Sequence, residues 1–203
     1  MAEARYQRHM QDHRARHFTA VAEALEAHVD AHDVRRIVLA GEPRNVALFR
    51  QELAPRIAEL VVGTIAGAHR EETHVIVDRA AEYLAHVERD ARAVDEALTI
   101  AAKRGKATAG LDATLEAVNR GAAYRLYLLK GWSAPGRRCT GCGALQGGFT
   151  WVCPACGRDA ITVELGEAMA ARVIASDGAV KTIPIHQPLA AAGGVAAELR
   201  FPL

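Results

Sequence analysis

The chain has 203 residues and a mass of 21.8 kDa, which is room for one large or two small domains. Charged residues make up 24% and apolar residues 50%, as in ordinary globular proteins, and the formal net charge of +1 excludes a global basic field that would attract nucleic acid. No apolar run reaches the roughly 18 residues that a membrane span needs. The charged N-terminal stretch lacks the apolar region of a signal peptide, so we expect a cytoplasmic protein.

The first third of the chain alternates helix and strand patterns. Residues 4–32 predict one long amphipathic helix, and the short apolar run 37–40 predicts a buried strand. A short helix follows, with Asn45 as its predicted N-cap, and Pro55 is expected to end it or to begin the next turn. Residues 59–68 predict a second strand, which leads into a glycine-bearing loop.

The rest of the chain continues this alternation. The strongest signal is an unbroken apolar stripe from about Glu71 to Arg104, which predicts a long helix that Gly105 terminates. Further elements are predicted in this order: a helix at 110–121, a strand at 122–131, a mainly helical segment at 161–178, a strand at 179–185 and a final strand at 193–201.

Alternating helices and strands indicate an α/β protein. We expect two small α/β domains with two-layer or three-layer packing of helices on sheets, divided near Gly67 to Arg70 into residues 1–67 and 68–203. The first would hold only two strands, and a two-stranded sheet is marginal alone. We therefore expect it to lean on the second domain or to be completed by strands outside this chain.

All of the chain's cysteines lie in one stretch, CTGCGALQGGFTWVCPACG, as two Cys-x-x-Cys pairs with ten residues between them. In a reducing compartment such pairs favour metal over disulfide. Four thiolates surround Zn²⁺ tetrahedrally, and two matched turns can present them from a hairpin whose return strand would be GGFTWV. The spacing predicts a structural Zn²⁺ site, in an insertion spanning 137–158, with the ligands Cys139, Cys142, Cys153 and Cys156.

Two other readings of the cysteines are weaker. A redox pair needs only one Cys-x-x-Cys, and a catalytic zinc needs an open coordination position that four sulfurs do not leave. Arg137, Arg138 and Arg158 flank the loop, and Trp151 lies within it. This composition suits contact with RNA phosphate or an acidic protein face; the alternative is a solvated collar around a stability element.

Histidines offer a second, weaker candidate for metal chemistry. His9, His13 and His17 recur every four residues on one helix face, which permits a metal clip, although the polar flank of the core or a basic surface is the simpler interpretation. His186 follows a predicted strand, where a role in a turn is the simpler interpretation. A metal-dependent hydrolase using His9, His13 or His186 is a hypothesis that metal analysis would test. No nucleophile–base constellation and no phosphate-binding fingerprint is apparent.

The order of VRRIVLAGEPRNVALFRQEL, ELVVGTIAGA, a long helix, TLEAVNRGAAYRLYLLKG, a Cys-x-x-Cys insertion and GGVAAELRF resembles the middle-to-C-terminal part of class-one peptide-chain release factors of archaeal and eukaryotic type, together with Pelota and bacterial relatives. The resemblance covers nearly the whole chain. It implies a two-domain α/β fold, a zinc-binding insertion in the second domain, and a role in translation termination or ribosome rescue. The implied partners are the ribosome, a translational GTPase or tRNA, with RNA contact and no membrane.

The chain also departs from that family pattern. In release factors a Gly-Gly-Gln loop, which helps water attack peptidyl-tRNA, precedes a helix that resembles residues 4–32. We expect this chain to lack that loop, because it begins at the helix and its Gln146-Gly147-Gly148 run is reversed and lies in the cysteine insertion. The resemblance therefore implies a binding part without catalytic residues, from a fragment or a truncated gene product. The alternative function is a structured-RNA-binding domain of small ribosomal-protein type.

Overall fold

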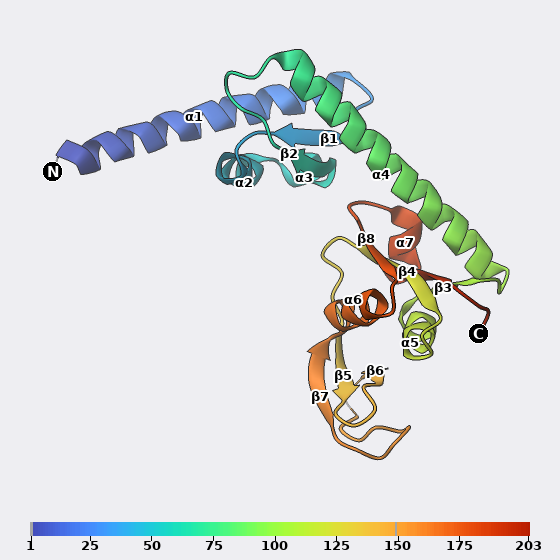
Figure 1. Ribbon diagram of the computed structural model, residues 1–203. Helices are drawn as coiled ribbons and strands as arrows, with labels where there is room; N and C mark the ends of the chain where they lie inside the picture. The colour runs from blue at the N-terminus through green and yellow to red at the C-terminus, as the bar shows by residue number, and fades with distance from the viewer. Residues whose placement is uncertain (1, 149) are drawn as a thin grey trace. The chain divides into compact units, whose positions relative to one another are not determined.

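The computed structural model describes the backbone at residues 2–148 and 150–203 and the side chains from residue 13 onward, apart from residue 149. The chain forms two compact units, Met1–Ala85 and His86–Leu203, and the long helix α4 (Thr73–Ala102) contributes to both (Figure 1). This division falls later than the expected boundary near Gly67, because the first half of α4 packs on the first unit. The Tyr83 hydroxyl there donates to the carbonyl of Val62 at 3.2 Å.

The first unit contains, in order, α1 (Ala2–Ala31), β1 (Ile37–Ala40), α2 (Pro43–Glu52), α3 (Pro55–Glu59), β2 (Val61–Ile65) and the start of α4. β1 and β2 pair in parallel, as the two strands of a small sheet. Its buried core comes from the strands and short helices, with α1 packed against them, and comprises Ile37, Leu39, Val46, Leu53, Ile57 and Val61. The predicted long helix and both strands of this unit are confirmed.

The prediction of Asn45 as the N-cap of α2 is wrong. The helix begins at Pro43, whose ring fixes the backbone angle that a first helical residue needs. Glu42 is the cap, and its carboxylate accepts a hydrogen bond from the backbone N–H of Asn45 at 3.3 Å. Pro55 occupies the matching first position of α3, which agrees with its expected role at a turn.

The second unit is a three-layer α/β sandwich around a four-stranded mixed sheet in the order β3-β9-β4-β8. β4 runs parallel to β8 and antiparallel to β9, which is also antiparallel to β3. Besides the end of α4, its elements are β3 (Ala107–Ala109), α5 (Leu111–Asn119), β4 (Ala123–Leu129), α6 (Leu165–Ala175), β8 (Ala179–Ile183), α7 (Gln187–Ala191) and β9 (Val195–Leu199). The expected α/β class is confirmed.

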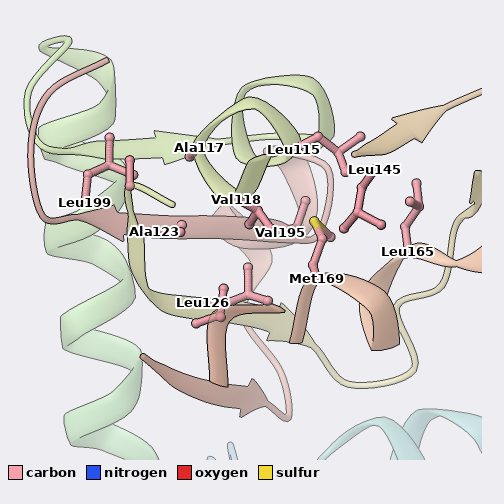
Figure 2. Close-up of a cluster of buried hydrophobic side chains, with 13 residues drawn as sticks. Leu115, Ala117, Val118, Ala123, Leu126, Leu145, Leu165, Met169, Val195 and Leu199 are labelled. Atoms are coloured by element: carbon pink, nitrogen blue, oxygen red, sulfur yellow. The ribbon is translucent and has the colours of Figure 1, made fainter. Parts of the chain in front are cut away.

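Side-chain alternation along the strands builds two cores in this unit. One face of the sheet packs on α5 and α6, where Leu126 and Val195 meet Met169 (Figure 2). The opposite face packs on α4 and α7, where Tyr127 and Ala196 lie among buried apolar residues. Because successive strand residues point to opposite faces, neighbours such as Leu126 and Tyr127 belong to different cores.

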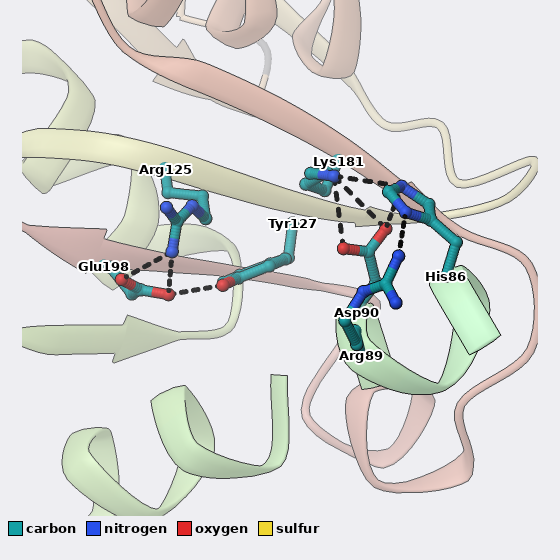
Figure 3. A network of polar contacts seen from close by, with 7 residues as sticks. All are labelled: His86, Arg89, Asp90, Arg125, Tyr127, Lys181 and Glu198. Atoms are coloured by element: carbon teal, nitrogen blue, oxygen red, sulfur yellow. Dashed lines mark hydrogen bonds and ion pairs between the residues drawn. The ribbon is translucent and has the colours of Figure 1, made fainter. Parts of the chain in front are cut away.

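Polar contacts join the sheet to α4 and also join two strands within the sheet (Figure 3). Lys181 of β8 forms an ion pair with Asp90 of α4 at 3.2 Å. On β9, Glu198 accepts hydrogen bonds from the hydroxyls of Tyr124 and Tyr127 and pairs with Arg125 at 3.2 Å. Every partner of this half-buried carboxylate is a donor, so the charge is well compensated inside the unit.

A three-stranded antiparallel ribbon extends the chain between β4 and α6. Its strands are β5 (Pro135–Cys139), β6 (Leu145–Gly147) and β7 (Ala160–Glu164), in the order β6-β5-β7. We refer to residues 135–164 as the ribbon. Phe149 of the predicted return strand GGFTWV lies outside the described residues; among the described ones, β6 ends at Gly147, and Val152 makes only an isolated bridge with Asp159.

The prediction of helix across most of 161–178 is wrong at its start. Residues 161–163 form part of β7, because this β-branched run pairs with β5 in register from Arg138–Ile161 to Gly136–Val163. The helix α6 begins only at Leu165, and the carboxylate of Glu164 caps it by accepting from the N–H of Glu167 at 2.6 Å. Across the described residues, none of the helices combines the length and the hydropathy that crossing a bilayer requires.

Candidate functional site

The cysteine pairs occupy two turns of the same construction at one end of the ribbon. In the first turn the N–H of Gly143 donates to the carbonyl of Cys139 at 3.1 Å, and in the second the N–H of Gly157 donates to that of Cys153 at 2.8 Å. Both glycines have φ of 72°, in the left-handed region that favours glycine. The Gly after each Cys-x-x-Cys is therefore what closes each turn and aims its two sulfurs inward.

The structure brings all four predicted ligands together. Their sulfur atoms lie within 4.8 Å of one another, with 3.3 Å between Cys139 and Cys156 and 3.6 Å between Cys142 and Cys153. A tetrahedral ion with metal–sulfur bonds of about 2.3 Å would set its sulfurs about 3.8 Å apart, so the cluster has the size of such a site. All four thiols are free, which excludes disulfides in this structure.

Backbone N–H groups around the cluster stabilise the thiolate form of Cys139. The backbone N–H groups of Cys142 and Gly141 donate to the sulfur of Cys139 and lower the pKa of its thiol to about 6. The N–H of Ala144 lowers the pKa of the Cys142 thiol, but the neighbouring sulfurs outweigh it and raise that pKa to about 11. The Cys139 thiolate thus forms readily, whereas the charge of a second thiolate at Cys142 needs a compensating cation.

The cysteine turns are fastened to the body of the second unit from α5 and α6. The Asn119 carboxamide bonds both backbone groups of Leu145, and Arg172 donates to the carbonyl of Gly143 at 2.7 Å. Leu145 is itself buried in the core beneath α5 and α6. At Gly136, an added Cβ would meet the side chain of Leu165 at 2.5 Å, so the ribbon lies directly against α6. The ribbon is therefore a fixed projection of the unit.

The residues expected to contact a partner divide into buried and exposed ones. Arg137 is only 5% exposed; its Nη1 donates to the Thr162 hydroxyl at 2.8 Å and its guanidinium lies against the indole of Trp151. The expectation that Arg137 offers its charge to a partner is therefore wrong, because strand alternation turns it onto the covered face of β5. Arg138, Arg158 and Trp151 are exposed, as expected.

Among the side chains that the structure describes, the histidines do not assemble into a metal site. The side chain of His9 lies outside the described residues, His13 is exposed, and His17 lines a cavity of about 560 Å³ in the first unit. His186 is buried and caps α7: its Nδ1 accepts from the N–H of Leu189 at 3.1 Å and its Nε2 lies 3.2 Å from Asp95. From residue 13 onward, the four cysteines are the only described group of three or more ligands with metal-site geometry.

Among solved structures, several translation factors match the chain, each with a TM-score below 0.5. A peptide chain release factor C-terminal domain from Methanosarcina mazei is 20% identical with a TM-score of 0.45, and the match covers 67% of this chain and 99% of that one. Pelota from Archaeoglobus fulgidus is 19% identical with a TM-score of 0.41, over 91% of this chain and 54% of its own. Pelota from Thermoplasma acidophilum is 19% identical with a TM-score of 0.40, over 93% of this chain and 53% of its own.

The chain thus spans about half the length of the Pelota proteins that it matches. None of the curated proteins matches it. The sequence profile described as "Bacterial archaeo-eukaryotic release factor family 2" matches residues 1–108, more than half of the chain and as far as the first strand of the second unit's sheet. The chain belongs to this bacterial family of archaeo-eukaryotic release factors.

Proposed function

We propose that the chain serves translation termination or ribosome rescue as a docking part, which binds the ribosome or a partner translation factor in the cytoplasm. The observation that carries the proposal is the family match over residues 1–108. A translational GTPase and tRNA are further partners that membership of a release-factor family suggests. The second unit would contribute the ribbon as a contact arm, because Asn119 and Arg172 hold it in a fixed position.

Within that function, Cys139, Cys142, Cys153 and Cys156 would hold one structural Zn²⁺. The support is the size of the sulfur cluster, the N–H donors around Cys139 and the pair of matching turns. With four sulfur ligands no position remains for water or substrate, so the ion would supply folding energy, on the order of 10 kcal/mol, and no catalysis. The four residues keep the two turns together and the ribbon's tip ordered.

We also propose that these residues alone do not hydrolyse peptidyl-tRNA. No Gly-Gly-Gln run occurs in the 203 residues. The reversed run Gln146-Gly147-Gly148 is an unsuitable substitute, because Gln146 and Gly147 pair with β5 as part of a strand. Such backbone pairing leaves the glutamine without the free loop that would carry it to an ester bond.

Co-sedimentation with bacterial ribosomes tests the docking role. The purified chain should pellet with ribosomes, and the same preparation should leave ribosome-bound peptidyl-tRNA intact over the time in which a complete release factor hydrolyses it. Hydrolysis by this chain would contradict the binding-only assignment. Equal affinity for any structured RNA, with an affinity that falls steeply as salt rises, would instead support the RNA-binding alternative of small ribosomal-protein type.

A further inference from the structure

Trp151 is the largest apolar side chain exposed on the ribbon, and it is held in one orientation. Its exposed fraction is 63%, although its backbone is fixed by a hydrogen bond from the N–H of Ala160 to its carbonyl at 2.8 Å. The guanidinium carbon of Arg137 lies 3.3 Å from the centroid of its ring system. One face of the indole is thus covered by a cation, and the exposed area belongs to the other face and the edges.

The support beneath the indole is rigid. Arg137 is buried and anchored by its hydrogen bond to Thr162, which lies directly opposite it on β7. A cation stacked on a tryptophan contributes roughly 0.5–2 kcal/mol, depending on how far the pair is desolvated. Because the ring is already oriented, a ligand that stacks on its free face would lose little side-chain entropy on binding.

From this geometry we infer that Trp151 is a stacking platform for an unpaired RNA base, an inference that rests on the proposed ribosome-docking function and names its contact chemistry. A flat, open aromatic face is what an unstacked base recognises, whatever its sequence. The cysteine cluster and the hydrogen bond from Asn119 to Leu145 hold the ribbon as a projection. A projecting aromatic face can reach a base that is turned out of its stack.

The charges of the ribbon fit a contact in which stacking dominates. Arg158 is exposed and available for phosphates, but Arg138 points to the same face as its partner Ile161, away from Arg137, and the carboxylate of Asp159 is exposed on the same ribbon. Only about one or two phosphates could be neutralised, so the affinity should fall only shallowly with salt. This separates a base platform from a general RNA-binding surface, which would show a steep salt dependence.

The chain offers a clean optical test because it has two tryptophans. Trp132 packs on the core of the second unit and donates from Nε1 to the carbonyl of Gly193 at 2.7 Å. In a Trp132→Phe variant, all tryptophan fluorescence comes from Trp151. Single-stranded oligoadenylate should quench its fluorescence in a saturable manner, and an RNA duplex of equal charge should not.

Variants separate stacking from other effects, with affinity measured by anisotropy of a labelled oligoadenylate. Trp151→Ala should weaken binding about tenfold, whereas Trp151→Phe should retain most of it. Ile161→Ala is the matched control: Ile161 is 45% exposed on the ribbon but points to the face opposite Thr162 and Arg137, so its affinity should not change. Metal content and circular dichroism of each variant establish that the ribbon is folded.

Several outcomes would overturn the inference: no quenching by oligoadenylate, equal quenching by the duplex, or unchanged affinity in folded Trp151→Ala. Loss of ribosome binding in Trp151→Ala without any RNA affinity would overturn it in favour of a protein contact. These results are distinguishable from failure of the docking proposal. If the chain pellets with ribosomes but oligoadenylate does not quench Trp151, only the base-platform inference fails. If oligoadenylate quenches Trp151 but the chain does not pellet with ribosomes, only the ribosome-docking proposal fails.

Discussion

The carboxamide of Asn119 bonds both backbone groups of Leu145: its Nδ2 donates to the carbonyl at 2.7 Å, and its Oδ1 accepts from the N–H at 2.8 Å. Asn119 is the last residue of α5 and Leu145 the first of β6. This pairing replaces the strand partner that β6 lacks on its outer edge. It joins the end of the ribbon that carries the cysteine turns to the core of the second unit.

Asn119→Ala should therefore destabilise the second unit. The substitution leaves the N–H and the carbonyl of buried Leu145 without partners, and such a loss costs about 1–3 kcal/mol. Denaturant unfolding followed by circular dichroism measures the effect. Asn45→Ala is the control, because the side chain at position 45 is exposed and only its backbone N–H, which donates to the capping carboxylate of Glu42, takes part in the start of α2. Equal denaturant midpoints for the two variants would show that the hydrogen bonds between Asn119 and Leu145 do not stabilise the fold.

The purified chain should contain one zinc ion. Cys153→Ser should lose it, because a buried sulfur of the cluster is replaced by a weaker ligand, while His13→Ala should keep it. Elemental analysis of both variants gives the stoichiometry, and acidification should release the ion as the thiolates take up protons. Zinc that survives Cys153→Ser but leaves with His13→Ala would favour the metal-dependent hydrolase hypothesis.

The Glu198 network predicts a dependence of stability on pH. Burial alone raises the pKa of this carboxyl, but hydrogen bonds from Tyr124 and Tyr127 and the charge of Arg125 outweigh it, so the pKa lies below its ordinary value. A carboxyl with a lowered folded-state pKa stabilises the fold above its unfolded-state pKa of about 4.3, and that contribution disappears as the pH falls through the folded-state pKa.

Glu198→Gln should consequently be less stable than the wild type at pH 7, by about 1–3 kcal/mol, and the difference should shrink below about pH 4.3. Thermal unfolding over a pH series compares the two proteins. A difference that stays constant from pH 7 to pH 3 would show that the carboxylate charge is not what the tyrosines and Arg125 stabilise.

Gly63 on β2 has no space for a side chain. An added Cβ would lie 2.0 Å from the hydroxyl oxygen of Tyr83, in a contact that also involves the ring. Gly63→Ala should displace Tyr83 and destabilise the first unit by about 1–3 kcal/mol. Thr64→Ala, at the exposed neighbouring position, is the control. Chemical unfolding that shows equal stability for both would mean that α4 does not pack on β2 as described.

Local patterns predicted much of the fold, where they were long or repeated. The apolar stripe of α4 and the paired Cys-x-x-Cys turns are such signals, because helical period and ligand spacing are properties of the sequence itself. Strands β3 and β6 have only three residues each, too few for an alternation to be visible. Their pairing is set by partners distant in the chain.

The predictions that the structure corrects also fail because the deciding contacts lie far away in the sequence. The pattern of 161–178 predicts mainly helix because the helical stripe of α6 dominates it, and only pairing with the distant strand β5 shows that 161–163 belong to β7. The composition around the cysteines indicates Arg137 as a candidate partner contact, but its position opposite Thr162 and beneath Trp151 depends on strand register, which the local sequence does not give. The hydrogen bonds of Asn119 with Leu145 join residues 26 apart in sequence, and no local pattern predicts them.

Ribosome co-sedimentation of Cys153→Ser beside the wild type and His13→Ala tests the central claim, that a metal-ordered ribbon on a release-factor fold docks on the ribosome. Circular dichroism first establishes that the helices of each variant are intact. The account predicts that the wild type and His13→Ala pellet with ribosomes, whereas Cys153→Ser binds at least about tenfold more weakly. Equal pelleting of a zinc-free Cys153→Ser variant, or no pelleting of the zinc-loaded wild type, would contradict it.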